Sequence, residues 1–165
     1  MSEASGAPVR IHPPHGTVIA CESGASRYAV DLWAGRHHLV ADEPKEAGGG
    51  DLGPNPYELL AAALAACTTM TLRMYADRKG WPVRRISVAV THRKVHARDC
   101  ADCETKEGFV DVLERVIELE GELSEEQRQR LLEIANRCPV HRTLTGEVKI
   151  RSRLARVMPQ EVPGG

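Results

Sequence analysis

The feature that most constrains the fold is one long apolar segment, residues 56–79, with a helix signal at each end. Asn55 suits the N-cap position and Pro56 the first helical position. Glu58 lies three residues after Asn55, where it can close a capping box, and Gly80 can end the helix. Residues 59–67 are apolar on every side. We therefore expect a single helix that is buried all round.

Alternating, β-branched segments surround this helix and predict strands. A capping box of Ser124 and Gln127 opens a second helix, which Pro139 ends at Cys138. The predicted strands span residues 17–22, 26–33, 36–41, 84–96, 109–121 and 146–154. The apolar residues of 109–121 suit the period of either a helix or a strand, and the Val and Ile content with a glycine at each end favours the strand. The order βββ-α-ββ-α-β predicts an α+β fold. We expect one domain over 16–157, between a flexible arm at 1–15 and a tail at 158–165.

The gross properties exclude several classes of protein. The 165 residues carry a formal net charge of −1, which offers no electrostatic basis for binding nucleic acid or an anionic membrane. The N-terminus lacks a secretory signal. We expect no apolar run as long as the ~20 residues needed to span a bilayer. Residues 46–53 are rich in glycine but lack the Lys-Ser/Thr of a phosphate-binding loop. We expect a cytoplasmic protein with no cofactor.

Five cysteines, an odd number, argue against a structural disulfide framework. Cys67 lies within the apolar helix. Cys138 precedes Pro139 and so suits the N-cap of a new short helix, whose free N–H groups stabilise a thiolate. Free cysteine is also among the most buried residue types, so core packing remains the alternative for both thiols. Cys21, on the first strand, is expected to be a core residue.

The other two cysteines, Cys100 and Cys103, form a Cys-x-x-Cys motif close to His96. The motif could supply two zinc ligands and His96 a third, but a second such motif is missing from the sequence. A lone Cys-x-x-Cys can equally be a redox disulfide. A metal site, an exposed dithiol or disulfide, and no role at all stay open.

Three stretches resemble one known family. They are GPNPYELLAAALAACTTMTLRMYA, NRCPVHRTL, and HHLVADEP with the glycine-rich loop that follows it. Over roughly residues 17–155 the chain resembles the osmotically inducible protein C and organic hydroperoxide resistance (OsmC/Ohr) family. The resemblance implies an intertwined homodimer with two central helices packed against curved antiparallel sheets. It also implies a cytoplasmic enzyme that reduces organic hydroperoxides with electrons from small or lipoyl dithiols, with Cys67 as peroxidatic thiol and Cys138 as resolving thiol.

The sequence departs from the family pattern beside Asn55. The best-studied peroxidases have Glu two residues after this Asn, and an Arg from the N-terminal strands pairs with that Glu and with the thiolate. Here Tyr57 takes that place and Glu58 follows, rotated by ~100° about the helix. Tyr57 could donate a hydrogen bond or only pack.

Arg27 and Arg36 are the candidate cations from the first strands, with plain surface charge as their alternative. His37 and His38 alternate faces, so one of them, with His38 as the candidate, is expected to point inward.

The leading hypothesis is a thiol peroxidase in oxidative-stress defence. Apolar side chains at Leu60, Leu64 and Met70 would favour an organic hydroperoxide as its substrate. The rivals are a non-catalytic protein that binds a small ligand on the same fold, and a metal-binding module at Cys100 and Cys103.

Overall fold

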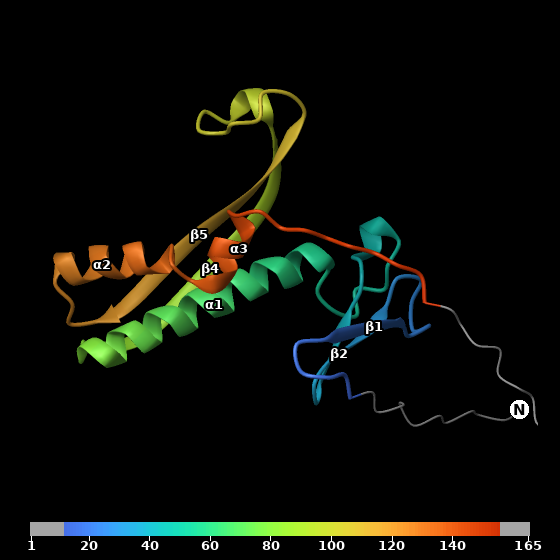
Figure 1. The fold of residues 1–165 in the computed structure, drawn as a ribbon, viewed down its shortest axis with the longest axis horizontal. Helices are drawn as coiled ribbons and strands as arrows, with labels where there is room; N and C mark the ends of the chain where they lie inside the picture. The colour runs from blue at the N-terminus through green and yellow to red at the C-terminus, as the bar shows by residue number, and fades with distance from the viewer. Residues whose placement is uncertain (1–11, 156–165) are drawn as a thin grey trace, which may run out of the picture.

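The computed structural model describes residues 12–155 and has an α+β architecture with two separate antiparallel sheets, as predicted (Figure 1). The predicted arm and tail lie largely outside these residues. The elements are β1 (Val18–Glu22), β2 (Val30–Ala34), β3 (His37–Ala41), η1 (Lys45–Ala47), α1 (Pro56–Lys79), β4 (Val83–His96), η2 (Ala97–Asp99), β5 (Phe109–Gly121), α2 (Glu125–Ala135) and α3 (Pro139–Leu144).

The ends of α1 are set by local chemistry, as expected. The Asn55 side chain accepts a hydrogen bond from the Glu58 N–H at 2.9 Å, and the Glu58 carboxylate accepts one from the Asn55 N–H at 2.8 Å. Gly80 ends the helix with a left-handed φ of 64°. By length and composition alone this 24-residue helix could cross a membrane, which the sequence-based expectation overlooked. In the structure α1 packs against β4, α2 and α3.

The core lies where α1, α2 and the β4–β5 hairpin meet. β4 and β5 pair from Val83↔Gly121 to His96↔Phe109, and both helices lie along the same hairpin (Figure 1). Leu72 of α1 and Leu131 of α2 are fully buried at the centre. The remaining buried residues of this core are Tyr75, Ala76, Val83, Ile134 and Ala135.

The expectation that α1 is buried all round is wrong for the single chain. Five small or apolar residues at helical spacing form an exposed row that we call the α1 stripe: Leu60, Ala63, Ala66, Met70 and Met74. Met70 and Met74 are 64% and 65% exposed. One face of α1 meets the hairpin and α2, whereas the stripe meets nothing in the described chain.

The N-terminal sheet is joined to α1 by a loop built around one buried carboxylate. Asp42 is 2% exposed and accepts hydrogen bonds from the Ser26 hydroxyl at 2.7 Å and from the Gly50 N–H at 2.9 Å. Burial raises the pKa of Asp42, but these hydrogen bonds, with others from the backbone, outweigh it and hold the pKa below its ordinary value. A Cβ on Gly49 would collide with the Glu43 carbonyl, which explains one glycine of this loop.

The predicted strand over 146–154 is the clearest error of the sequence-based fold. The structure has no strand there, and all nine residues are exposed. The segment runs from α3 back toward the N-terminal sheet without joining it (Figure 1). Its alternating pattern suits a strand, but a strand needs a neighbour to accept and donate its backbone hydrogen bonds, and the described chain offers none here.

Candidate functional site

The structure brings Cys67 and Cys138 to the same turn of helix. The Val140 N–H donates to Cys67 Sγ at 3.5 Å, and the next amide, the His141 N–H, donates to Cys138 Sγ at 3.3 Å. Both cysteines are free. Two thiols from segments far apart in the sequence therefore share consecutive donors in the first turn of α3.

Cys138 sits where its sequence context predicted. It is the N-cap of α3, with Pro139 at the first helical position. Its side chain is fully buried, whereas Cys67 is half-buried and lies on the same helical face as the α1 stripe. Cys67 is therefore the more accessible of the two thiols to solvent.

Arg115 is a site residue that the sequence reasoning missed. From β5 its guanidinium donates to Thr68 Oγ1 at 3.0 Å, to the Ala135 carbonyl at 3.1 Å and to the Asn136 side chain at 2.7 Å. Thr68 Oγ1 lies 3.7 Å from Cys138 Sγ. Arg115 therefore places a positive charge one hydroxyl away from the buried thiol.

A signal for Arg115 was present in the sequence. In β5 the inward positions alternate through Leu113, Ile117 and Leu119, and Arg115 occupies the same parity. A charged residue at an apolar position of an alternating strand needs a buried partner. The pairing of β5 with the helices, which the sequence does not give, decides which partner it meets.

His141 adds a neutral imidazole beside these groups. Burial lowers the pKa of His141 below its ordinary value of 6.5, and the nearby Arg115 charge lowers it further. The His141 ring is therefore uncharged at neutral pH. The positive charge close to it is the guanidinium of Arg115.

Glu58 and Tyr57 are engaged away from the thiols. The Glu58 carboxylate closes the helix cap on Asn55. Tyr57 stacks on the ring of His92, with centroids 4.2 Å apart and planes 3° from parallel. His92 in turn lies 2.8 Å from Asp111, and this hydrogen bond is the main reason why the pKa of Asp111 is lowered.

The candidate cations of the N-terminal sheet do not reach the thiols within the described chain. Arg27 is exposed and lies over the Tyr28 ring at 5.4 Å, and Arg36 is exposed in the turn between β2 and β3. His38, expected to point inward, is exposed and pairs with Asp31 at 2.7 Å. Cys21 is exposed, so the prediction that it belongs to the core is wrong.

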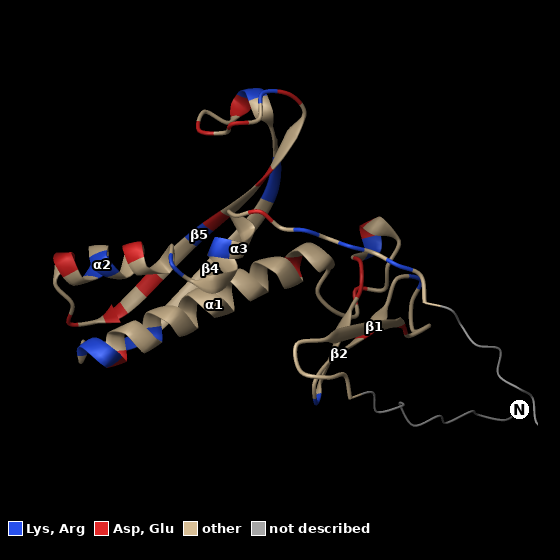
Figure 2. Ribbon diagram, viewed as in Figure 1, with Lys and Arg blue, Asp and Glu red and all other residues tan. Residues whose placement is uncertain are grey.

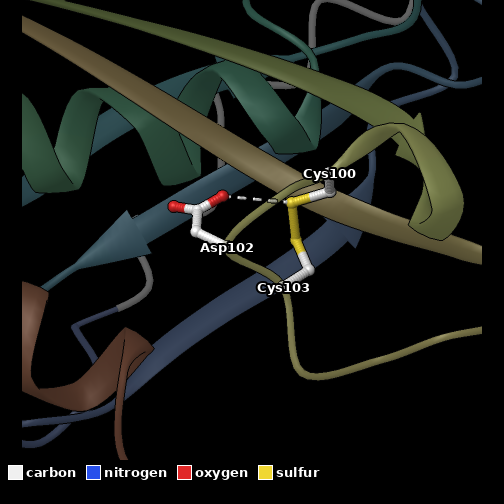
Figure 3. Close-up of side chains that lie close together, drawn as sticks. All are labelled: Cys100, Asp102 and Cys103. Atoms are coloured by element: carbon white, nitrogen blue, oxygen red, sulfur yellow. Dashed lines mark hydrogen bonds between the residues drawn. A yellow bond between two sulfur atoms is a disulfide. The ribbon is translucent and has the colours of Figure 1, made fainter.

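Cys100 and Cys103 form a disulfide in the loop between η2 and β5, and Asp102 Oδ1 lies 3.4 Å from Cys100 Sγ (Figure 3). The cluster of possible metal ligands contains these three residues but not His96, the third ligand suggested by the sequence. His96 packs instead against the Phe109 ring, with centroids 5.1 Å apart.

Comparison with known proteins identifies the family. The sequence profile of OsmC-like proteins matches residues 48–153, and the chain belongs to this family. That range holds both thiols, the α1 helix and Arg115. A search of curated protein sequences finds no significant match.

Solved structures share the fold. The organic hydroperoxide resistance protein OsmC from Legionella pneumophila is 25% identical, with a TM-score of 0.57 over 79% of this chain and 90% of its own. An OsmC-like protein from Mycoplasma pneumoniae is 21% identical, with a TM-score of 0.61 over 79% and 86%. The organic hydroperoxide resistance protein OhrB of Bacillus subtilis is 22% identical, with a TM-score of 0.55 over 79% and 90%.

Proposed function

We propose that this protein is a cysteine-based peroxidase that reduces organic hydroperoxides, with Cys67 as the attacking thiol and Cys138 as the resolving thiol. Membership of the OsmC-like family, with relatives named for organic hydroperoxide resistance, supports a role in redox or peroxide defence. The observation that carries the finer proposal is the pair of consecutive amides, at Val140 and His141, that bind the two sulfurs.

The difference in burial between Cys67 and Cys138 supports these roles. The Cys67 thiolate attacks the distal oxygen of the hydroperoxide, the O–O bond breaks, and the alcohol leaves with one proton, so that Cys67 becomes a sulfenic acid. The Cys138 thiol then displaces water from that sulfenic acid, and the two cysteines form a disulfide. An external dithiol, small or lipoyl, reduces this disulfide and restores both thiols.

Arg115 supplies the positive charge that Arg27 and Arg36 do not supply within the described chain. It acts through Thr68, whose hydroxyl lies between the guanidinium and Cys138 Sγ. Thr68 Oγ1 also donates to the Leu64 carbonyl at 2.8 Å. A hydroxyl so held can accept from the Cys138 thiol, or turn to donate to a thiolate, without any movement of the backbone.

The apolar side chains of the α1 stripe favour an organic hydroperoxide as the substrate. Leu60 and Met70 flank the half-buried Cys67 on the same helical face, whereas Leu64, also expected there, is buried in the chain. An alkyl group gains roughly 0.8 kcal/mol for each CH₂ that it buries, so a few carbons give more than tenfold preference over hydrogen peroxide.

We also propose that the working form is a homodimer. The α1 stripe is apolar and exposed, and residues 146–154 have the pattern of a strand without a neighbour in the described chain. Val148, Ile150 and Leu154 of that segment are 56%, 89% and 98% exposed. A second copy of the chain would pack on the stripe, with the thiol site and the side chains that bind the alkyl group at the edge of the interface, and would give the segment a strand to pair with. Sedimentation equilibrium at micromolar concentration is expected to show a dimer, and a monomer would contradict this.

The peroxidase proposal is tested with the fully reduced protein. The second-order rate constants with cumene hydroperoxide and with hydrogen peroxide are measured across pH, with dihydrolipoamide for turnover. The Cys67→Ser variant is expected to lose peroxide consumption. The Cys138→Ser variant should complete one oxidation and then over-oxidise to sulfinic acid. Cys21→Ser, which removes an exposed thiol elsewhere, is the matched control and should retain full activity.

One observation favours a second candidate, a non-catalytic protein that binds a small apolar ligand. The Glu58 carboxylate caps its own helix, so the carboxylate–arginine pair of the best-studied peroxidases is not formed within the described chain. If neither peroxide reacts faster than with free cysteine at the same thiolate fraction, the binding role replaces the peroxidase role.

A further inference from the structure

The loop between β4 and β5 carries a second group of reactive side chains, far from the first. It projects from the end of the hairpin opposite α2 (Figure 1), whereas Cys67 and Cys138 both accept hydrogen bonds from amides of α3. Sγ of Cys100, Sγ of Cys103 and a carboxylate oxygen of Asp102 all lie within 4.8 Å of one another (Figure 3). The proposed peroxidase uses none of these residues.

A purely structural role explains this arrangement poorly. The disulfide joins residues only three apart, so it closes a very short loop and restricts the unfolded chain little. The loop is already closed by the backbone, because the Ala97 N–H donates to the Gly108 carbonyl at 2.8 Å and the Cys103 N–H to the Cys100 carbonyl at 3.4 Å. Both cysteines are only half-buried, so reductants and oxidants can reach them.

The charges around the motif favour a cation once the disulfide is reduced. Residues 98–107 hold four acidic side chains, at Asp99, Asp102, Glu104 and Glu107, against two basic ones, at Arg98 and Lys106. Figure 2 shows both signs on this loop. Two thiolates beside the Asp102 carboxylate would repel one another, and a divalent cation bound between the three groups removes that repulsion.

We propose that the Cys100–Asp102–Cys103 cluster is a redox-gated site for a thiophilic divalent cation, Zn²⁺ above all. Two sulfur donors and one carboxylate select zinc over magnesium or calcium, which prefer oxygen ligands alone. Tetrahedral zinc with Zn–S bonds of about 2.3 Å holds two sulfurs roughly 3.8 Å apart, so reduction and a small separation of the sulfurs suffice. Three protein ligands leave the fourth position to water, which makes the metal exchangeable.

Oxidation of the two thiolates to the disulfide releases the metal, in a reaction that balances in atoms and electrons. An organic hydroperoxide takes two electrons from the two zinc-bound thiolates and two protons from solvent. The products are the Cys100–Cys103 disulfide, one alcohol, one water and free Zn²⁺. The disulfide in the structure is the metal-free end of this cycle, since disulfide sulfurs are poor zinc ligands.

The test uses the 165-residue chain with Cys21, Cys67 and Cys138 replaced by Ser, so that Cys100 and Cys103 are its only thiols. After reduction and anaerobic removal of the reductant, it is titrated with Co²⁺ as a spectroscopic probe and with Zn²⁺ against a chromophoric chelator. We expect one metal per chain and a thiolate-to-cobalt charge-transfer absorption. Adding cumene hydroperoxide should release the metal and restore the disulfide. Because Cys67 is absent, the outcome does not depend on the proposed peroxidase.

Matched variants of this protein identify the ligands. Cys100→Ser or Cys103→Ser should abolish the charge-transfer absorption, and Asp102→Asn should weaken metal binding at least tenfold with the absorption retained. Asp99→Asn, which changes a neighbouring acid outside the cluster, should bind within twofold of the parent. The proposal is overturned if the reduced parent binds no stoichiometric metal, if the disulfide form binds equally well, or if Asp102→Asn and Asp99→Asn behave alike.

Discussion

Replacing Arg115 by methionine tests most sharply how the two thiols are held together. The change keeps much of the apolar stem but removes three hydrogen bonds, to Thr68, Ala135 and Asn136. The Ala135 carbonyl also accepts a hydrogen bond from the Cys138 N–H at 3.4 Å. Arg115 therefore binds the same carbonyl that holds the backbone of the resolving cysteine. Hydrogen bonds from a charged donor are worth about 1.5–3 kcal/mol each, and water can replace the one to the exposed Asn136. Because Arg115 is only half-buried, we expect Arg115→Met to lower the free energy of unfolding by about 2–4 kcal/mol, which is less than the full value of the two remaining bonds.

Arg115→Met should also slow the step in which Cys138 forms a disulfide with Cys67. If Cys138 is displaced even slightly, its approach to the Cys67 sulfenic acid slows, and we expect a loss of about tenfold or more in that step. One equivalent of cumene hydroperoxide is added to the reduced protein, the reaction is quenched at intervals, and mass spectrometry separates trapped sulfenic acid from disulfide. Arg115→Lys keeps the charge and one donor, so it should restore part of the rate.

Arg128 provides the matched control. It also anchors a helix to β5 through backbone carbonyls, those of Leu119 at 2.9 Å and Gly121 at 3.2 Å, but it lies away from the thiols. Arg128→Met should lower stability to a similar extent, by about 1–3 kcal/mol, without slowing disulfide formation. If Arg115→Met closes the disulfide as fast as Arg128→Met does, the proposed positioning role of Arg115 is wrong.

Three further predictions concern stability and assembly. Leu131→Ala should lower the free energy of unfolding by about 2–5 kcal/mol in denaturant titrations, whereas Leu132→Ala, at a side chain 49% exposed, should change it by less than about 0.5 kcal/mol. The pKa of His141 in the folded protein lies below 6.5, so as the pH falls His141 is protonated in the unfolded chain before it is protonated in the folded one. Stability should therefore fall as the pH drops from 6.5 to the folded pKa. His141→Gln should flatten that part of the pH profile, and NMR titration of the ring checks the direction of the shift. Ile150→Asp should move the sedimentation equilibrium toward monomer, and an unchanged dimer would show that residues 146–154 are not part of the interface.

Features set by a few neighbouring residues could be read from the sequence. The capping box of Asn55 and Glu58 fixes where α1 begins, and the geometry imposed by Pro139 makes Cys138 an N-cap. These interactions span one turn of helix, so local composition suffices to predict them. The alternation of β4, and the Val and Ile content of β5 with a glycine at each end, predicted both strands to within a residue.

The choice of partners could not be read in this way. Arg115 meets Thr68 across 47 residues of sequence, and that contact exists only because β5 pairs with β4 in one register beneath α1. The same limit explains the error at residues 146–154, because alternation indicates that a strand is possible but not that a neighbouring strand is present. Local periodicity determined the elements of this protein. The tertiary structure alone decided which side chains surround each thiol and which apolar faces stay uncovered, because those depend on how distant elements pack.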